Sequence, residues 1–403
     1  MLFGIMSIKS KNASVPDIFL NIGHLLDHFM MLIFAKAAYD GGRYFGLQYD
    51  EMIVFGTLGM VLFGATAPLA GFLSDKFGRM PLMITYHFGI GISAIIASFS
   101  SSPFQLAICL GLIGLFASIY HPVGIAMLLQ RPGLVGMRLG INGVWGNMGI
   151  AIAPIVTGIL LYYGDWKLTF LVPGLFCILF GMLFFLNINR NEEKPQNGKR
   201  EKQRSVGFTP QWQQALFALA LSTASGGFLF GAMSFLLPRY FELHMQSIST
   251  NVAITGILAG IVYACASFAQ VAIGWLIDRV SPRLVMFWIA LGQVVFIYLA
   301  SHFENLTLFF LSIAAMCFVF GQIPITDTIL VRYVPDHWRS RILSAKFLLN
   351  LCIGAAVLPV TSQLLKAGYD LKTVFTFASV IAIGVVLSSI MLPKQTKKLN
   401  PNI

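Results

Sequence analysis

Residues 71–80 read GFLSDKFGRM, and residues 274–283, which lie 203 positions later, read GWLIDRVSPR. The same shift superposes pairs of like residues along the chain: Gly71 on Gly274, Asp75 on Asp278, Lys76 on Arg279, Arg138 on Arg341 and Asn147 on Asn350. An internal repeat of this length indicates two copies of one structural unit. The sequence therefore predicts two halves of the same architecture.

Long apolar runs surround both copies, because 57% of the 403 residues are hydrophobic and only 11% are charged. The mean hydropathy is +0.78. A helix needs about 20 apolar residues to cross a bilayer core, and it satisfies its own backbone hydrogen bonds there. Twelve such runs are present: Ile18–Ala37, Met52–Leu73, Leu82–Phe99, Phe104–Leu129, Leu139–Tyr162, Leu168–Leu186, Ala215–Leu237, Val252–Leu276, Leu284–Leu299, Leu306–Leu330, Ile342–Leu365 and Val374–Leu392.

The fold class that these runs predict is an all-α membrane protein with twelve transmembrane helices. A membrane barrel is excluded because runs such as LAICLGLIGLFASI do not alternate apolar and polar residues. We expect a six-helix bundle over residues 1–188, a polar cytoplasmic linker over 189–211, and a second six-helix bundle with a short cytoplasmic tail over 212–403. Six helices per half make the repeat parallel, with a pseudo-twofold axis.

The net charge of +11 records topology, because the Lys and Arg residues are distributed unevenly between the two sides of the predicted membrane. Twenty of the 27 fall in the segments on the side of the N-terminus, and few fall on the other side: Arg43, Lys167, Arg239, Lys366 and Lys372. Cytoplasmic loops carry such an excess. We therefore expect an inner-membrane protein with both termini in the cytoplasm, whose basic residues contact lipid headgroups and not nucleic acid.

The loop at residues 71–80 resembles the conserved loop of the major facilitator superfamily, through Gly71, Asp75, Gly78 and Arg79. The second copy departs from that pattern at Ser281, where a glycine is usual. Gly71 would permit close helix contact, Gly78 a tight turn, and Asp75 a contact with a cation such as Arg341 that latches the cytoplasmic side shut. The predicted gating set is Gly71, Asp75, Lys76, Gly78, Arg79, Asp278, Arg279 and Arg341.

Within the superfamily, NIGHLLDHFMMLIFAKAAY in the first predicted helix and IYHPVGIAML in the fourth are similar to the fosmidomycin-resistance group of efflux transporters. Two features depart from related drug and proton antiporters. Ala153 precedes Pro154 where a glycine is usual, and the fourth helix lacks the intramembrane arginine of many proton-coupled members. The resemblance implies efflux of a small toxic or antibiotic compound.

His24, Asp27 and His28 stand three and four residues apart in the first helix, which places them on one helical face. An ionisable group in mid-membrane is costly, so it must face a partner or a water-filled cavity. An imidazole beside a carboxylate can load and release a proton during transport. Two alternatives stay open, a polar network that bridges helices and a divalent-ion site, and we expect no resident metal ion.

The resemblance implies that the first, fourth, seventh and tenth helices line the central cavity. Polar residues of these helices, together with Lys346 of the eleventh helix, form the candidate proton and substrate set: His24, Asp27, His28, Tyr120, His121, Gln322, Thr326, Asp327 and Lys346. Asp327 is expected to neutralise either a cationic substrate group or Lys346.

The predicted function is proton-coupled secondary transport of a small solute by alternating access, with efflux favoured. The alternative is uptake of an organic anion such as a carboxylate siderophore, with His121, Lys346 and Lys36 as anion contacts. We expect no enzyme activity and no cofactor, because phosphate loops and nucleophile motifs are missing from the sequence. The expected partners are a small-molecule substrate, protons and the lipid bilayer, and the expected oligomeric state is a monomer.

Overall fold

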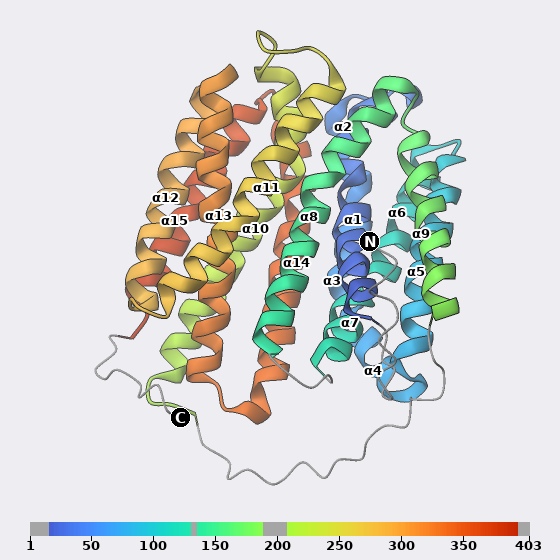
Figure 1. Ribbon diagram of the computed structural model, residues 1–403. Coiled ribbons are helices and arrows are strands. Elements are labelled where there is room, and N and C mark those ends of the chain that lie inside the picture. Colours follow the sequence, from blue (N-terminus) through green and yellow to red (C-terminus); the bar gives the residue numbers. More distant parts are fainter. Residues whose placement is uncertain (1–15, 130–134, 188–207, 394–403) are drawn as a thin grey trace, which may run out of the picture.

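The computed structural model describes residues 16–129, 135–187 and 208–393, and every regular element in these ranges is helical (Figure 1). Most of the predicted linker and tail, residues 188–207 and 394–403, lies outside the described residues. The elements are α1 Asp17–Phe45, α2 Tyr49–Ile53, the 3-10 helix η2 Val54–Gly56, α3 Thr57–Ala65, α4 Ala67–Phe77, α5 Arg79–Ser98, α6 Pro103–Ala117, α7 Tyr120–Leu129, α8 Val135–Tyr163, α9 Leu168–Asn187, α10 Trp212–His244, α11 Val252–Ile277, α12 Pro282–His302, α13 Asn305–Tyr333, α14 Asp336–Lys366 and α15 Leu371–Met391.

Eleven segments of the described chain are long and apolar enough to cross a membrane, and a bent pair, Tyr49–Ala65 with Ala67–Phe77, makes a twelfth. The predicted class, an all-helical membrane protein with about twelve spans, is confirmed. Several helices run past the predicted ends. For example, α1 continues to Phe45, beyond the predicted end at Ala37, so that Asp40 is also a helical residue.

The second span is not the straight helix that Met52–Leu73 predicted, because its axis turns by 46° between α3 and α4. Pro68 lies just after the turn, where it has no N–H to donate to the carbonyl four residues earlier and its ring clashes with that carbonyl. Thr66 fills the break, since its hydroxyl oxygen lies within hydrogen-bond distance of the Leu62 carbonyl oxygen, at 2.6 Å, and of Ser118 Oγ, at 2.8 Å.

The fourth span also breaks, between α6 and α7. Pro122 stands four residues after Ser118, so the same loss of a backbone hydrogen bond separates the two helices. This break lies directly before Tyr120 and His121, at the start of α7.

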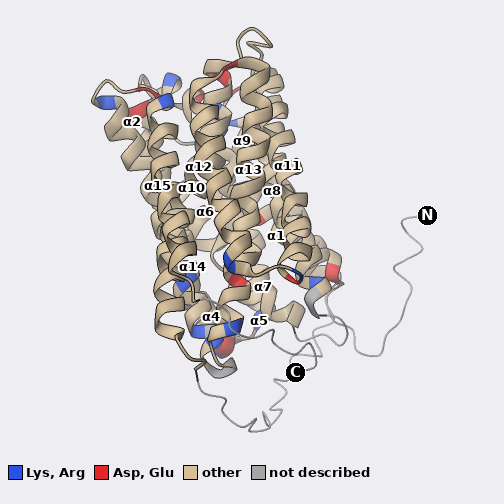
Figure 2. Ribbon diagram, turned by 90° about the vertical axis from the view of Figure 1, so that its left-hand side faces the viewer, with Lys and Arg blue, Asp and Glu red and all other residues tan. Residues whose placement is uncertain are grey.

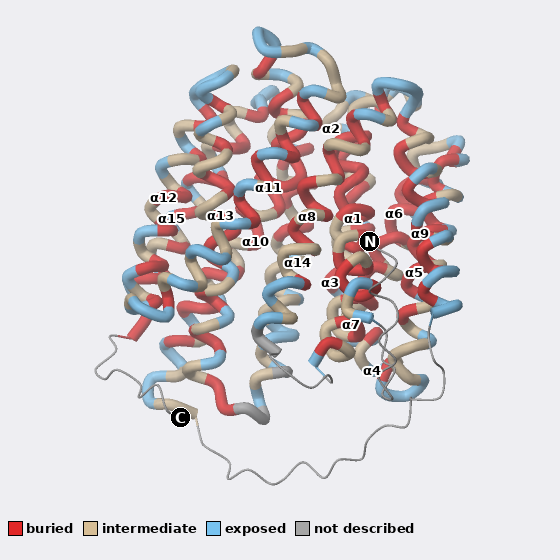
Figure 3. Tube along the Cα trace, viewed as in Figure 1, coloured by how far each residue is buried: buried red, intermediate tan, exposed pale blue. Residues whose placement is uncertain are grey.

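The two halves lie side by side, with α12, α13 and α15 on one flank and α5, α6 and α9 on the other (Figure 1). Helix α8 packs against both α1 of its own half and α11 of the other half. Helix α14 also contacts α2, η2 and α3 of the first half, and α1 contacts α10 of the second. Buried residues concentrate where helices face one another, while exposed residues mark the outer faces and the lower part of α14 (Figure 3).

Glycines on α8 and α11 mark a close contact between these two helices at one end. A Cβ built at Gly256 would lie 2.3 Å from the Pro154 carbonyl oxygen, and one at Gly158 would lie 2.8 Å from the Val252 carbonyl oxygen. A Cβ at Gly143 or at Gly274, near the other ends of the two helices, would have no atom within 4 Å. We call the first end the sealed end and the second the open end, which is the end where α1 begins.

Charged residues gather at both ends of the molecule, and the middle is almost free of them (Figure 2). Large apolar side chains are exposed on the outer helices, for example Leu179 on α9 at 56% and Trp288 on α12 at 59%. Water would make such exposure costly, whereas lipid tails accept it. The apolar flanks are the surface that meets the bilayer.

Candidate substrate and proton site

Three imidazoles meet at the contact of α1 with α7. We call His24, His28 and His121 the imidazole cluster. The ring centroids are 5.0 Å apart for His24 and His28, 5.1 Å for His24 and His121, and 5.3 Å for His28 and His121. Asp27 lies beside the cluster, completely buried, with Oδ2 3.4 Å from His121 Nε2. His121, from the fourth span, therefore joins the group that the spacing in the first helix had predicted.

A polar network from α8 fixes the cluster from one side. The His24 ring stacks on Tyr120, with centroids 4.8 Å apart, and His24 Nδ1 lies 2.8 Å from the Asn142 carbonyl oxygen. The Asn142 side chain donates to Asn21 Oδ1 at 3.0 Å and to the Tyr120 hydroxyl at 2.8 Å. The Tyr120 hydroxyl in turn donates to the Leu20 carbonyl oxygen at 2.6 Å. Tyr120 thus orients His24, and the whole network holds one ring in place.

The cluster has acceptor atoms without donors. Neither carboxylate oxygen of Asp27 has a hydrogen-bond partner, and neither does His24 Nε2 or either ring nitrogen of His121. The 3.4 Å approach of His121 to Asp27 is close enough for a charge pair but lacks hydrogen-bond geometry. No Lys or Arg among the described residues pairs with Asp27. Buried polar groups are normally satisfied, so the unpartnered atoms of Asp27 and His121 make this group the candidate functional site.

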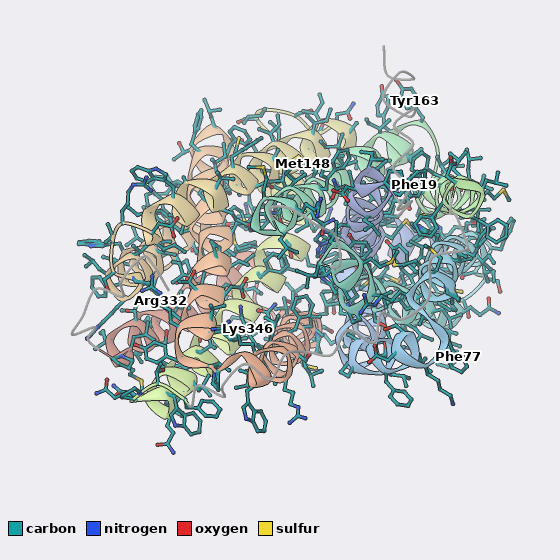
Figure 4. The ribbon with its side chains drawn as sticks, turned by 60° about the horizontal axis from the view of Figure 1, so that its bottom comes forward. Phe19, Phe77, Met148, Tyr163, Arg332 and Lys346 are labelled. Atoms are coloured by element: carbon teal, nitrogen blue, oxygen red, sulfur yellow. The ribbon has the colours of Figure 1, made fainter. Side chains whose placement is uncertain are left out.

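The predicted residues of the second half form two separate groups. Asp327 on α13 pairs with Lys346 on α14 at 2.5 Å, and the Asp327 side chain is 51% exposed. Gln322 accepts from Gln293 at 2.8 Å and donates to Ser222 Oγ at 2.8 Å. Figure 4 brings the open end forward and shows Lys346 toward the middle of the molecule. Of the two partners that the sequence left open for Asp327, the structure provides Lys346.

Thr326 and Phe347 both belong to the second half, but only Phe347 contacts the first half near the site. The Thr326 hydroxyl donates to the Ile323 carbonyl oxygen at 2.9 Å, within its own helix. The Phe347 ring, next to Lys346 in α14, lies 4.7 Å from the His121 ring, centroid to centroid. The second half therefore reaches the imidazole cluster through an aromatic side chain.

The predicted gating loop is formed but not latched. Gly78 adopts φ +92°, which favours glycine, and the predicted turn is confirmed. A Cβ at Gly71 would make an ordinary contact of 3.6 Å with Pro122, so this conformation does not require glycine there. Asp75 is exposed and makes no ion pair or hydrogen bond with any described residue. In this conformation nothing joins Asp75 to Arg341.

The basic residues of the gating set make local contacts. Arg79 donates to the Ala126 carbonyl oxygen at 3.2 Å, and Lys76 lies 5.2 Å from the centre of the Phe77 ring. The remaining contacts stay within single helices or their ends: Arg279, next to Asp278, stacks on Trp275 at 4.0 Å, and Arg341 stacks on Trp338 at 4.9 Å. Each cation of the set thus touches only its own half.

The sequence reasoning missed an ion cluster at the sealed end. The buried Lys36 of α1 pairs with Glu242 of α10 and donates to Thr255 Oγ1 of α11 at 2.9 Å. Arg239 pairs with Glu242 at 2.7 Å, and its guanidinium lies 3.5 Å from the centre of the Tyr39 ring. Lys36 itself could have indicated the cluster, because a cation inside an apolar run is costly unless it is paired. Nothing in the sequence identified that partner 206 residues away.

Comparison with known proteins points to one family. The sequence profile described as Major Facilitator Superfamily matches residues 19–262 and 242–402. The chain is 24% identical to a protein named multidrug resistance protein MdtG from Proteus mirabilis (strain HI4320). The alignment spans 351 residues and covers 84% of this chain and 85% of that protein. A protein of the same name from Salmonella arizonae is 23% identical over 334 residues, 81% of this chain and 80% of that one.

Solved structures share the fold. A bacterial homolog of the human lysosomal transporter Spinster, in an inward-facing and occupied conformation, superposes with a TM-score of 0.74 at 15% identity and covers 95% of this chain and 96% of that one. A D-xylose–proton symporter gives a TM-score of 0.72 at 14% identity, over 93% of this chain and 95% of that one. At such identity the likeness concerns architecture alone.

Proposed function

The chain belongs to the major facilitator superfamily, and from that premise we propose that it exports a small organic compound in exchange for protons. Members of this superfamily are secondary transporters and not enzymes. The direction of transport rests on the relatives named multidrug resistance protein. We place the protein in the bacterial inner membrane with both termini in the cytoplasm, so the open end faces the cytoplasm.

The observation that carries proton coupling is the Asp27 carboxylate, which is fully buried and has no donor and no Lys or Arg partner. A bare carboxylate in a dry site is expensive, so the group must bind a cation before the site closes around it. A proton is the smallest such cation. His121, 3.4 Å away, can take the proton from Asp27 or return it when the site opens to the other side.

Alternating access follows from the asymmetry of the two ends. At the sealed end Lys36 and Glu242 tie the halves together, while at the open end Asp75 has no partner. In the opposite state we expect the pair at the sealed end to part and Asp75 to close on Arg341. One set of ionic contacts would thus replace the other as the halves rock.

Uptake of an organic anion receives less support than export. Both lysines expected as anion contacts already have carboxylate partners, Glu242 for Lys36 and Asp327 for Lys346. His121 lies beside the acidic Asp27, which would repel an anion. The curated relatives give no support to siderophore transport.

The test is proton-driven flux in vesicles that contain the purified protein, with a panel of antibiotics and dyes as substrates. Asp27→Asn should abolish flux driven by a pH gradient and preserve substrate exchange without a gradient, since binding and rocking persist. Asp327→Asn is the matched control, because that carboxylate has its own lysine and its loss should leave coupling in place. Undiminished gradient-driven flux in Asp27→Asn would overturn the proposal.

A further inference from the structure

We propose that the imidazole cluster is also a binding site for a transition-metal ion of the Zn²⁺ class. His24, His28 and His121 each offer a ring nitrogen, and these atoms all lie within 4.8 Å of one another. They come from two helices, α1 and α7, so the grouping is a product of the fold and not of one helical face. This inference goes beyond the proposed function, because metal binding requires no transport.

The tautomer of His24 suits it to be a ligand. His24 Nδ1 lies 2.8 Å from the Asn142 carbonyl oxygen, which can only accept, so Nδ1 carries the hydrogen. The lone pair of the ring is therefore on Nε2, which is buried and has no hydrogen-bond partner. Metal-bound histidines characteristically donate their other ring nitrogen to a backbone carbonyl in this way.

His121 lies beside a carboxylate, the other common partner of a metal-binding imidazole. Its Nε2 lies 3.4 Å from Asp27 Oδ2, and a small rotation of the ring would turn this approach into a hydrogen bond. That bond would leave Nδ1, which also has no partner, to bind the metal. A carboxylate that orients a metal-binding imidazole raises the basicity of the ligand and fixes its direction. Asp27 would then act on the metal through His121.

The geometry requires a modest contraction. A tetrahedral Zn²⁺ at about 2.0–2.1 Å from each nitrogen places the nitrogens about 3.4 Å apart, so each ring must move by somewhat under 1 Å. Three protein ligands leave the fourth position open, which is typical of exchangeable sites and not of structural ones. Three imidazoles favour Zn²⁺, Cu²⁺, Ni²⁺ or Co²⁺ over Mg²⁺ and Ca²⁺, which prefer oxygen ligands.

The experiment measures binding of CoCl₂ and ZnCl₂ to the full-length protein, purified in detergent through a tag without histidines. Titration with CoCl₂ should give saturable visible absorption bands at one ion per chain, and ZnCl₂ should displace them. His28→Gln and His121→Gln should each weaken binding more than about 100-fold, because loss of a residue that only orients a ligand already costs about 10- to 100-fold. Asp27→Asn should weaken it about 10-fold without abolishing it.

The matched control is His302→Gln, which removes an exposed histidine at the end of α12 and should leave the titration unchanged. Each variant is first compared with the parent protein by its elution volume and melting temperature, so that loss of fold is separated from loss of a ligand. Absence of saturable absorption in the parent, or equal binding in His28→Gln and the parent, would refute the site. Neither result touches proton-driven flux, which tests the proposed function by itself.

Discussion

The two ends of the molecule use the same kinds of residue in opposite ways. At the sealed end a buried lysine pairs with a part-buried glutamate of the other half, and glycines bring the α8 and α11 backbones into contact. At the open end Lys346 and Asp327 pair within one half, Asp327 is half exposed, and glycines of α8 and α11 face empty space. The difference teaches that a charge pair closes this protein only where it bridges the halves.

The comparison predicts its largest effect for Lys36→Gln. Loss of one partner from a buried ion pair typically costs 3–5 kcal/mol, because the other charge is left without compensation. Glu242 keeps Arg239, so we expect a smaller loss of about 2–3 kcal/mol, seen as a lower melting temperature in detergent.

Lys346→Gln is the control for that variant, because it removes the same side chain at the open end. Asp327 can turn to solvent, so the cost should stay below about 1 kcal/mol. If both variants lowered the melting temperature equally, the distinction between a pair that bridges the halves and a pair within one half would be lost.

A second, somewhat smaller effect is expected from a single methyl group on α11. In Gly256→Ala the new Cβ would meet the Pro154 carbonyl oxygen at 2.3 Å, and since that atom is backbone, one helix must shift. Overpacking of this kind costs about 1–3 kcal/mol. Gradient-driven flux should fall about tenfold, because the sealed end can no longer close fully.

Gly274→Ala makes the same change at the open end of the same helix, where nothing lies within 4 Å. Alanine is the better helix former, so this variant should keep its flux and gain a few tenths of a kcal/mol in stability. Loss of flux in Gly274→Ala would mean that the open end closes on this glycine during the cycle, and would locate that contact.

How much of the structure the sequence predicted depended on how far apart along the chain the interacting residues lie. Apolar length predicted the helices, and the spacing of His24, Asp27 and His28 predicted their common face, because both follow from one helix at a time. The addition of His121 to the cluster depended on the packing of α1 against α7. Pro122 was visible in the sequence, but the direction in which the chain leaves a break is set by tertiary packing.

The missed residues show the same limit more strongly. Lys36 stood out in the sequence, yet its partner Glu242 belongs to the other half and was read as lying outside any span. Asn142, which orients His24, carries no charge and fits no motif, so only the assembled helices show that it is important. Contacts between distant segments were beyond the reach of pattern and composition.

The predicted latch offers a third and milder test of the comparison. Asp75 has no partner among the described residues in this state, so Asp75→Asn should leave the melting temperature unchanged. If Asp75 closes on Arg341 in the opposite state, loss of a contact worth about 1 kcal/mol should slow flux about fivefold. The double variant with Arg341→Gln should then be no slower than either single variant, and additive losses would refute the pairing.

The smallest effect is expected at Glu304, between α12 and α13 on the same side as the sealed end. Hydrogen bonds from Lys372 at 2.8 Å and from His244 hold the pKa of Glu304 below its ordinary value of 4.5. A carboxyl whose pKa is lower in the folded state stabilises the fold above pH 4.5, and this contribution is lost as the pH falls through the folded pKa. The melting temperature of Glu304→Gln should therefore lie slightly below that of the parent at pH 7 and converge with it once the pH falls below the folded pKa of Glu304. Because Glu304 is exposed and joins elements of one half only, a difference as large as that of Lys36→Gln would show that bridging the halves is not what makes a charge pair important here.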